Sequence, residues 1–112
     1  GHRCFVATTK PHVFARRIVE HFELSPYFTA VYGSELDGTR TDKTELLRYA
    51  QREQPAGKDS VMIGDRYHDI AGALNNGFRA IGVTWGYGTT DELLGAGAQC
   101  LAAAPVELPG LL

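Results

Sequence analysis

The sequence is poor in several features that assign a protein to a functional class. Its 112 residues contain two cysteines, Cys4 and Cys100, which are too far apart to match a zinc-binding spacing. The formal net charge of -2 gives no basic field for nucleic acid or an anionic membrane. No apolar run is long enough to span a bilayer. These absences favour a cytoplasmic protein with two buried, reduced thiols and with no nucleic-acid or membrane partner.

The beginning of the chain lacks an initiator methionine. Gly1 and His2 precede a segment that already has the composition of a buried strand. We therefore interpret residues 1–2 as a cloning remnant and residues 3–112 as a single domain that is an internal fragment of a longer protein.

Strand and helix patterns alternate along the chain. Strands are expected at residues 3–8, 30–32, 60–63, 79–83 and 99–102. Helices are expected from Pro11 to about Phe22 and at residues 42–54, 68–75 and 89–95, with a turn at 55–59. Asp42 is the expected N-cap of its helix, with Glu45 three residues later. This alternation predicts parallel βαβ units and an α/β, Rossmann-like fold.

An acidic pair follows the strand at residues 60–63. Ligands bind at the carboxyl ends of the strands in parallel sheets, and Asp65 stands at such an end, with Asp69 four residues later. Two carboxylates there could hold Mg²⁺, which prefers oxygen ligands and keeps several waters. Equally, Asp65 could form a turn and Asp69 could stabilise the start of a helix.

Two other strand or helix ends carry groups that suit an anion. Thr8 and Thr9 follow the first strand, where a hydroxyl could bind phosphate, although threonine is also common in strands. Lys43 lies in the first turn of its helix, where a cation opposes the helix dipole. A bound anion would favour this lysine, but an ordinary exposed lysine is the simpler interpretation.

Taken together, these residues resemble a known family. The order Thr8, Lys43, Asp65 and Asp69 resembles the second, third and fourth motifs of the haloacid dehalogenase (HAD) superfamily. The segments 8–11, 33–38, 85–88 and 105–108 are similar to its phosphoglycolate-phosphatase-like branch. The resemblance implies a three-layer Rossmann-like core from a Mg²⁺-dependent phosphomonoesterase that hydrolyses small phosphorylated metabolites through an aspartyl-phosphate.

The resemblance also implies a role for each residue. Thr8, supported by Thr9, would hydrogen-bond a phosphoryl oxygen, and Lys43 would neutralise charge on the nucleophile and the transferring group. Asp65 would bind Mg²⁺ directly. Asp69 would bind it through water or orient Lys43, and Gly64 would support the metal loop.

The family's nucleophile is missing from these residues. No Asp-x-Asp occurs in the sequence, so the first strand and the cap of the family are absent and the chain alone is predicted to be inactive. We expect the gap in the sheet to be closed by shifted strands, by a second copy or by a complementing polypeptide. A non-catalytic interaction or assembly module is the alternative. A nucleotide-binding or receiver-like domain is disfavoured, because no glycine-rich loop follows the first strand.

Aromatic and imidazole side chains near these motifs suggest no separate chemistry. Trp85 and Tyr87 occupy a glycine-flanked loop and are expected to pack rather than to contact substrate. His12, His21 and His68 lack an evident partner in the sequence and are expected to be exposed.

Overall fold

The structure is a computed structural model that describes residues 2–54 and 59–112. The chain divides into two compact units, Gly1–Gln54 and Pro55–Leu112, here called the N-terminal and C-terminal units. Parallel strands alternate with helices in each unit, which confirms the α/β class. Most of the turn expected at 55–59 lies outside the described residues, and the assignment of 3–112 to one domain stays a prediction.

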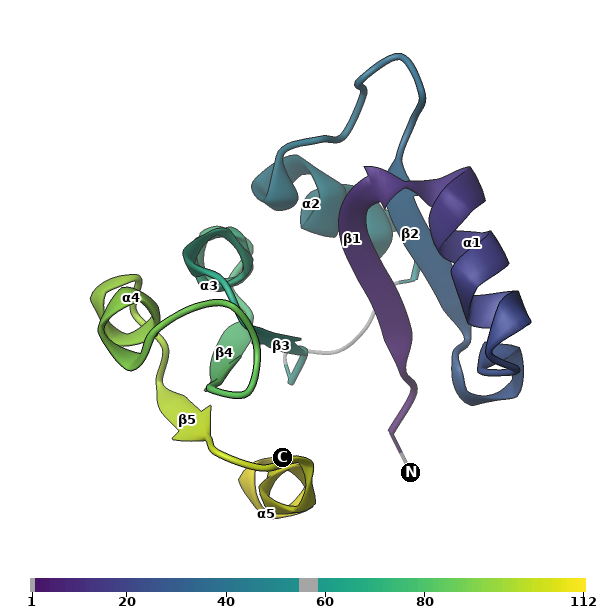
Figure 1. The fold of residues 1–112 in the computed structure, drawn as a ribbon. Helices are drawn as coiled ribbons and strands as arrows, with labels where there is room; N and C mark the ends of the chain where they lie inside the picture. Colours follow the sequence, from purple (N-terminus) through teal and green to yellow (C-terminus); the bar gives the residue numbers. More distant parts are fainter. Residues whose placement is uncertain (1, 55–58) are drawn as a thin grey trace. The chain divides into compact units, whose positions relative to one another are not determined.

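The N-terminal unit is a strand pair covered by two helices. Its elements are β1 (Phe5–Pro11), α1 (His12–His21), the short 3₁₀ helix η1 (Ser25–Tyr27), β2 (Ala30–Ser34) and α2 (Lys43–Glu53). The strands are parallel, with Ala7 opposite Tyr32 and Pro11 opposite Ser34, and the register shifts between Ala7 and Pro11. Helices α1 and α2 lie on either side of the pair (Figure 1). The sequence predicted every element but η1.

Apolar spacing and capping explain the helices of this unit. Leu46 and Leu47 are buried on α2, as are Ala15 and Val19 on α1. The side chain of Asp42 accepts a hydrogen bond from the Glu45 amide at 3.1 Å, which confirms the expected N-cap of α2. Lys43 follows this N-cap and is the first residue of α2.

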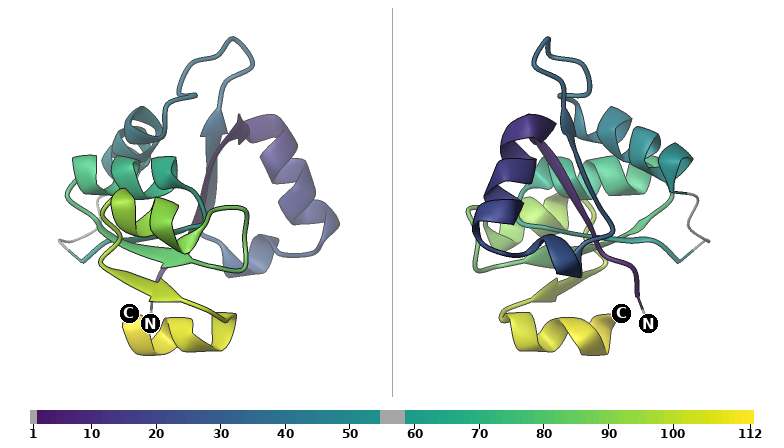
Figure 2. Two further views of the ribbon diagram at one scale, coloured as in Figure 1. Left: turned by 60° about the vertical axis from the view of Figure 1, so that its left-hand side comes forward. Right: turned by 90° about the vertical axis from the view of Figure 1, so that its right-hand side faces the viewer.

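The C-terminal unit is a three-stranded parallel sheet in the order β3-β4-β5. Its elements are β3 (Val61–Gly64), α3 (Tyr67–Asn75), β4 (Arg79–Val83), α4 (Thr90–Gly95), β5 (Cys100–Ala102), the 3₁₀ helix η2 (Pro105–Glu107) and α5 (Leu108–Leu111). Within this unit α3 and α4 cover one face of the sheet, and α5 lies on the other side (Figure 2). The sequence predicted all but η2 and α5.

The core of this unit explains that layering. Ile70, Ala73, Ile81 and Leu93 are fully buried. On the α5 side, Leu108 and Leu111 pack against Ile81, Val83 and Ala102. The apolar residues of the closing segment thus cover the second face of the sheet.

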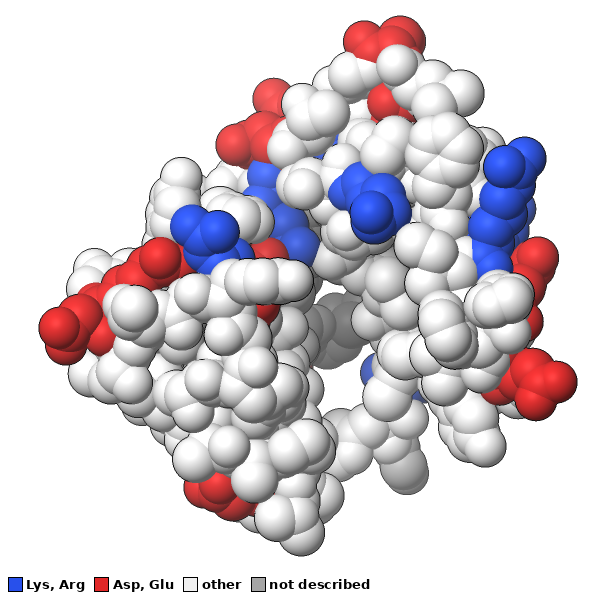
Figure 3. Space-filling view, in the orientation of Figure 1, with Lys and Arg blue, Asp and Glu red and all other residues white. Residues whose placement is uncertain are grey.

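Two expectations about the surface can be compared with the structure. Cys4 is exposed and Cys100 is half-buried, and both are free, so the prediction of two buried thiols is wrong. Cys4 precedes β1 and therefore lies outside the sheet. On the face drawn in Figure 3, basic and acidic side chains are interspersed and neither forms an extended field. Within the described ranges, no helix is long and apolar enough to cross a membrane.

Candidate functional site

Thr8 and Thr9 lie in the irregular end of β1. The Thr8 hydroxyl oxygen accepts a hydrogen bond from the Lys10 amide at 3.2 Å. Because a hydroxyl can accept and donate at once, its hydrogen can still be donated to an anion. The Thr9 carbonyl accepts a hydrogen bond from the Ser34 hydroxyl at 2.8 Å, and Ser34 is only 1% exposed. Ser34, which sequence reasoning missed, therefore ties the end of β1 to β2.

Lys43 is buried beside the same strand. Lys43 is only 7% exposed, and its ammonium donates a hydrogen bond to the Ala7 carbonyl at 2.7 Å. Ala7 immediately precedes Thr8, so the structure brings the predicted cation and the predicted hydroxyl segment together within the N-terminal unit. The interpretation of Lys43 as an ordinary exposed lysine is wrong. A buried cation at a helix N-terminus is costly, since both desolvation and the dipole oppose it.

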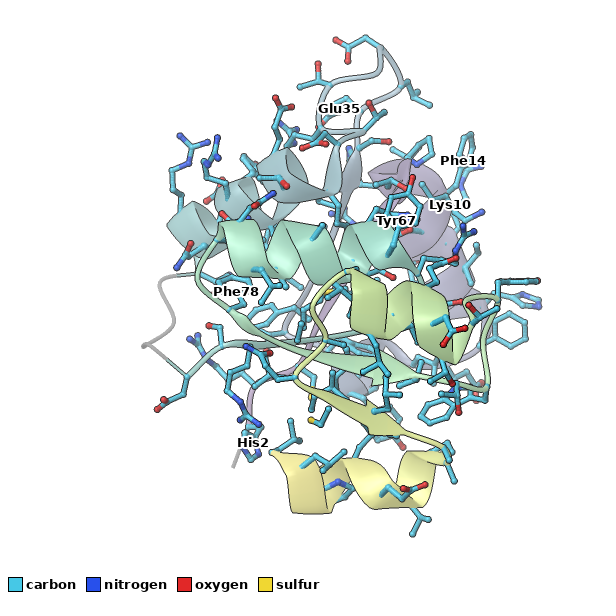
Figure 4. All side chains as sticks on the ribbon, turned by 90° about the vertical axis from the view of Figure 1, so that its left-hand side faces the viewer. His2, Lys10, Phe14, Glu35, Tyr67 and Phe78 are labelled. Atoms are coloured by element: carbon cyan, nitrogen blue, oxygen red, sulfur yellow. The ribbon has the colours of Figure 1, made fainter. Side chains whose placement is uncertain are left out.

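The loop that leads into Lys43 is held by a charged cluster around Glu35 (labelled in Figure 4). Glu35 pairs with Arg40 and lies 3.3 Å from His12 through the imidazole Nε2. The Arg40 guanidinium stands 4.1 Å from the centre of the Tyr49 ring, and Arg40 has a positive φ of 62°. The expectation that His12 is exposed is wrong: His12 is half-buried, because Glu35 directly after β2 lies beside the start of α1.

Asp65 and Asp69 come together at the end of β3. One oxygen of Asp69 (Oδ2) accepts hydrogen bonds from the amides of Asp65 and Arg66, each at 3.2 Å, and Asp69 is 6% exposed. A Cβ placed on Gly64 would lie 2.3 Å from the Asp69 Cβ, so only glycine permits this approach. The helix-start role expected for Asp69 is therefore real, and the support of a metal loop by Gly64 stays a prediction.

A glycine-flanked loop fixes the Asp65 side chain. The Tyr87 amide donates to Asp65 Oδ2 at 2.9 Å. A Cβ on Gly86 would lie 2.4 Å from the Asp65 Cβ, and one on Gly88 would lie 2.0 Å from the Asp65 carbonyl oxygen. The pair of glycines around Tyr87 was the sequence signal for this close approach. Tyr87 itself is 93% exposed, so the expectation that its ring packs is wrong.

Glu92, in the first turn of α4, completes the C-terminal group. One of its oxygens (Oε2) accepts from Arg66 Nε at 2.8 Å and from the Tyr67 amide at 2.9 Å. The hydrogen bond from Arg66, with that from the Tyr67 amide, lowers the pKa of Glu92 below its ordinary value of 4.5. Tyr67 stands at the start of α3 (Figure 4). Sequence reasoning missed Glu92, because acidic residues are common in any first helical turn.

The acidic pair fits one kind of metal better than others. Among residues 2–54 and 59–112, no three His, Cys, Asp or Glu side chains form a cluster that could hold a metal ion. Asp65 and Asp69 offer carboxylate oxygens, which suit hard cations such as Mg²⁺ rather than metals that prefer sulfur ligands. Mg²⁺, which is commonly bound by one or two carboxylates and several waters, fits the Asp65 and Asp69 donor set.

The predicted site residues divide between the two units. Thr8, Thr9 and Lys43 belong to the N-terminal unit, and Gly64, Asp65 and Asp69 belong to the C-terminal unit. The structure brings together the members of each group. That the two groups form one site stays a prediction. A cavity of about 410 Å³ in the N-terminal unit, lined by residues that include Arg16, Phe28 and Tyr32, contains none of these residues.

Comparison with known proteins gives a consistent set of similarities. A model of the HAD-hydrolase-like family matches residues 40–105, a range that includes Lys43, Asp65 and Asp69. A 5′-nucleotidase of Pseudomonas aeruginosa is 54% identical over 94 residues, which is 83% of this chain and 42% of that protein. The tyrosine-protein kinase PtkA of Mycobacterium tuberculosis is 40% identical over 92 residues, covering 81% and 32% of the two chains.

Solved structures agree with the sequence matches. The crystal structure of a predicted phosphatase from Clostridium acetobutylicum superimposes with a TM-score of 0.95 at 44% identity, covering 99% of this chain and 52% of that one. The chain thus spans about half the length, or less, of the relatives it matches.

Proposed function

We propose that this chain, which belongs to the HAD-hydrolase-like family, supplies the phosphate-neutralising and magnesium-binding parts of a phosphomonoesterase active site. The observation that carries the proposal is the burial of Lys43 with its ammonium 2.7 Å from the Ala7 carbonyl, next to Thr8. A fold that keeps a cation in this costly position gains from it when an anion binds nearby. The phosphoryl group of a substrate is such an anion.

In the proposed reaction, Thr8 and Lys43 act on the phosphoryl group. The Thr8 hydroxyl donates a hydrogen bond to a non-bridging oxygen, and the adjacent Thr9 belongs to the same phosphate-binding segment. Lys43 neutralises negative charge on the nucleophile and the transferring group. Phosphoryl transfer depends mainly on positioning and on stabilising spread negative charge, and these residues supply both.

Asp65 and Asp69 would hold Mg²⁺ in the same site. Asp65 is the proposed direct ligand, while Asp69 acts through water or orients Lys43. When bound, Mg²⁺ would supply further neutralisation of the phosphoryl oxygens. The backbone amides that bond to both carboxylates hold them in fixed positions at the end of β3.

The nucleophile and the substrate-selecting region would come from a longer parent protein. We propose an aspartate of that parent as the group that takes the phosphoryl, followed by hydrolysis of the aspartyl-phosphate by water. Small phosphorylated metabolites of the cytoplasm are the proposed substrates. Nucleoside monophosphates come first for testing, because one relative carries the name 5′-nucleotidase.

The test uses the parent protein with Mg²⁺ and an aryl phosphate or a nucleoside monophosphate. Lys43→Met and Asp65→Asn should each lower kcat by about 10²–10³-fold, the range seen when one transition-state-stabilising group is removed. The exposed Lys10, replaced in Lys10→Met, is the matched control and should leave kcat unchanged. The 112-residue chain alone should show no turnover. Unchanged kcat in both active-site variants would refute the proposal.

An assembly module is the alternative function. Among the residues that the structure describes, β1 pairs only with β2 in the N-terminal unit, and β3 pairs only with β4 in the C-terminal unit. Each strand therefore has one edge that another strand could pair with. Size-exclusion chromatography with light scattering measures the mass in solution. It therefore distinguishes an assembly with a second copy or a complementing chain from a monomer with shifted strands. A stable assembly together with an inactive parent would favour this alternative over the enzyme.

A further inference from the structure

The segment between the two candidate metal carboxylates is held from outside by Glu92. A single Glu92 oxygen receives both the Arg66 side chain at 2.8 Å and the Tyr67 amide at 2.9 Å. Glu92 belongs to α4, 25 residues further along the chain from Tyr67. Its contact is thus a tertiary one, directed at the main chain that links Asp65 to Asp69.

Glu92 is itself fixed in place. Its amide donates to the Thr89 hydroxyl at 3.1 Å, which caps α4. The preceding loop touches Asp65 directly through the Tyr87 amide at 2.9 Å. A Cβ on Gly88 would lie 2.9 Å from Glu92 Oε2 and 2.0 Å from the Asp65 carbonyl oxygen. One continuous segment, residues 87–92, therefore holds both the Asp65 side chain and the main chain that follows it.

We infer that Glu92 is a positioning residue for the metal loop, which acts through the Arg66 side chain and the Tyr67 main chain to fix the direction of the Asp65 carboxylate. This inference rests on the proposed function, in which Asp65 binds Mg²⁺. In the proposed site, Glu92 contacts neither the cation nor the phosphate. Groups that orient metal ligands in this way commonly contribute about 10–100-fold to metal affinity.

A plain surface ion pair between Arg66 and Glu92 is the competing explanation. Such pairs contribute little, because solvent screens them. The two explanations differ in the importance they give to the hydrogen bond from the Tyr67 amide to Glu92. In a surface ion pair this bond has no role, whereas a positioning residue depends on it. Arg66→Met removes the ion pair and keeps the amide bond, whereas Glu92→Ala removes both.

The first measurement is Mg²⁺ binding to the 112-residue protein by isothermal titration calorimetry. Glu92→Ala should raise the dissociation constant about tenfold or more. Glu92→Gln, which can still accept the Tyr67 amide, and Arg66→Met should each raise it much less. Asp91→Asn removes one negative charge from the neighbouring exposed position of α4 and is the matched control, with an unchanged constant. Equal affinities for wild type and Glu92→Ala would overturn the inference.

The second measurement needs no metal. Hydrogen exchange by NMR should show that Glu92→Ala loses protection at the amides of Tyr67 and Tyr87, while the β4 amide of Ile81 stays protected and shows that the unit is folded. Retained protection at Tyr87 would overturn the inference, because Glu92 would then have no effect on Asp65. If the wild-type protein shows no saturable Mg²⁺ binding, the metal part of the proposed function fails, and this second measurement still decides the role of Glu92.

Discussion

The candidate site residues of the two units are held in opposite ways: side chains donate to main-chain carbonyls in the N-terminal unit, whereas main-chain amides donate to the carboxylates of Asp65 and Asp69 in the C-terminal unit. Lys43 and Ser34 bond to the carbonyls of Ala7 and Thr9 on β1. Asp65 and Asp69 receive main-chain amides instead. Lys43, Asp65 and Asp69 are thus each matched with main-chain dipoles of the opposite sign.

The two arrangements should also respond differently to substitution. The cationic group depends on one long side chain that reaches back to β1. The acidic group depends on a close approach between two main-chain segments, which only glycine permits at Gly64, Gly86 and Gly88. The cationic group should therefore be disrupted by loss of the hydrogen-bond donor, and the acidic group by added side-chain volume.

Added volume in the C-terminal unit should give the largest effect. In Gly88→Ala the new methyl group would stand 2.0 Å from the Asp65 carbonyl oxygen, so the main chain must move. We expect the free energy of unfolding of this unit to fall by about 3 kcal/mol, the upper part of the usual range for overpacking. Urea unfolding followed by fluorescence of Trp85, the single tryptophan, measures it.

Gly95→Ala is the control for this prediction. Its methyl group meets nothing within 4 Å, and alanine favours a helix over glycine, so stability should be unchanged or rise by up to about 1 kcal/mol. If the urea midpoint of Gly88→Ala equals that of wild type, the loop around Asp65 is not tightly constrained.

Loss of the donor in the N-terminal unit should give an intermediate effect. Lys43→Met keeps the length of the side chain but leaves the Ala7 carbonyl without the ammonium. We expect a cost of about 1–3 kcal/mol, the range for a buried polar group that loses its partner. Hydrogen exchange at the buried Leu46 amide of α2 reports on this unit. Lys10→Met, on an exposed side chain, should have no effect, and equal loss in both variants would contradict the prediction.

The smallest effect should appear at acid pH. The pKa of Glu92 is lowered in the folded protein, so the unfolded state binds the proton more readily. The stability from this group is therefore present above pH 4.5, its ordinary value, and is lost as the pH falls through the folded pKa. Glu92→Gln should flatten the acid limb of the Trp85-monitored stability curve below pH 4.5. An identical acid limb in both proteins would contradict the assignment.

Asp37 offers the comparison for this pH effect in the N-terminal unit. Its pKa is lowered by hydrogen bonds from Thr39, two residues away. Because that contact lies within one turn, part of it can persist in the unfolded chain, and the stability gained should be smaller than for the long-range contact of Glu92.

Much of this protein was determined by the sequence alone. Alternating strand and helix periods predicted the α/β class, and the expected ends of two strands, near Thr8 and Gly64, located the chemically informative positions, because side-chain periodicity is a local property. The resemblance built on these residues is confirmed at the level of the family.

Only the tertiary structure decided which groups hold these residues in place. The burial of Lys43 against Ala7, the anchoring of Thr9 by Ser34, and the contacts of Glu92 and Tyr87 with the metal loop join segments 22 to 36 residues apart. Glycine, serine and glutamate have ordinary local roles that do not reveal such partners. Their function depends on which main-chain groups the fold leaves within hydrogen-bonding distance, and that is a property of packing rather than of local pattern.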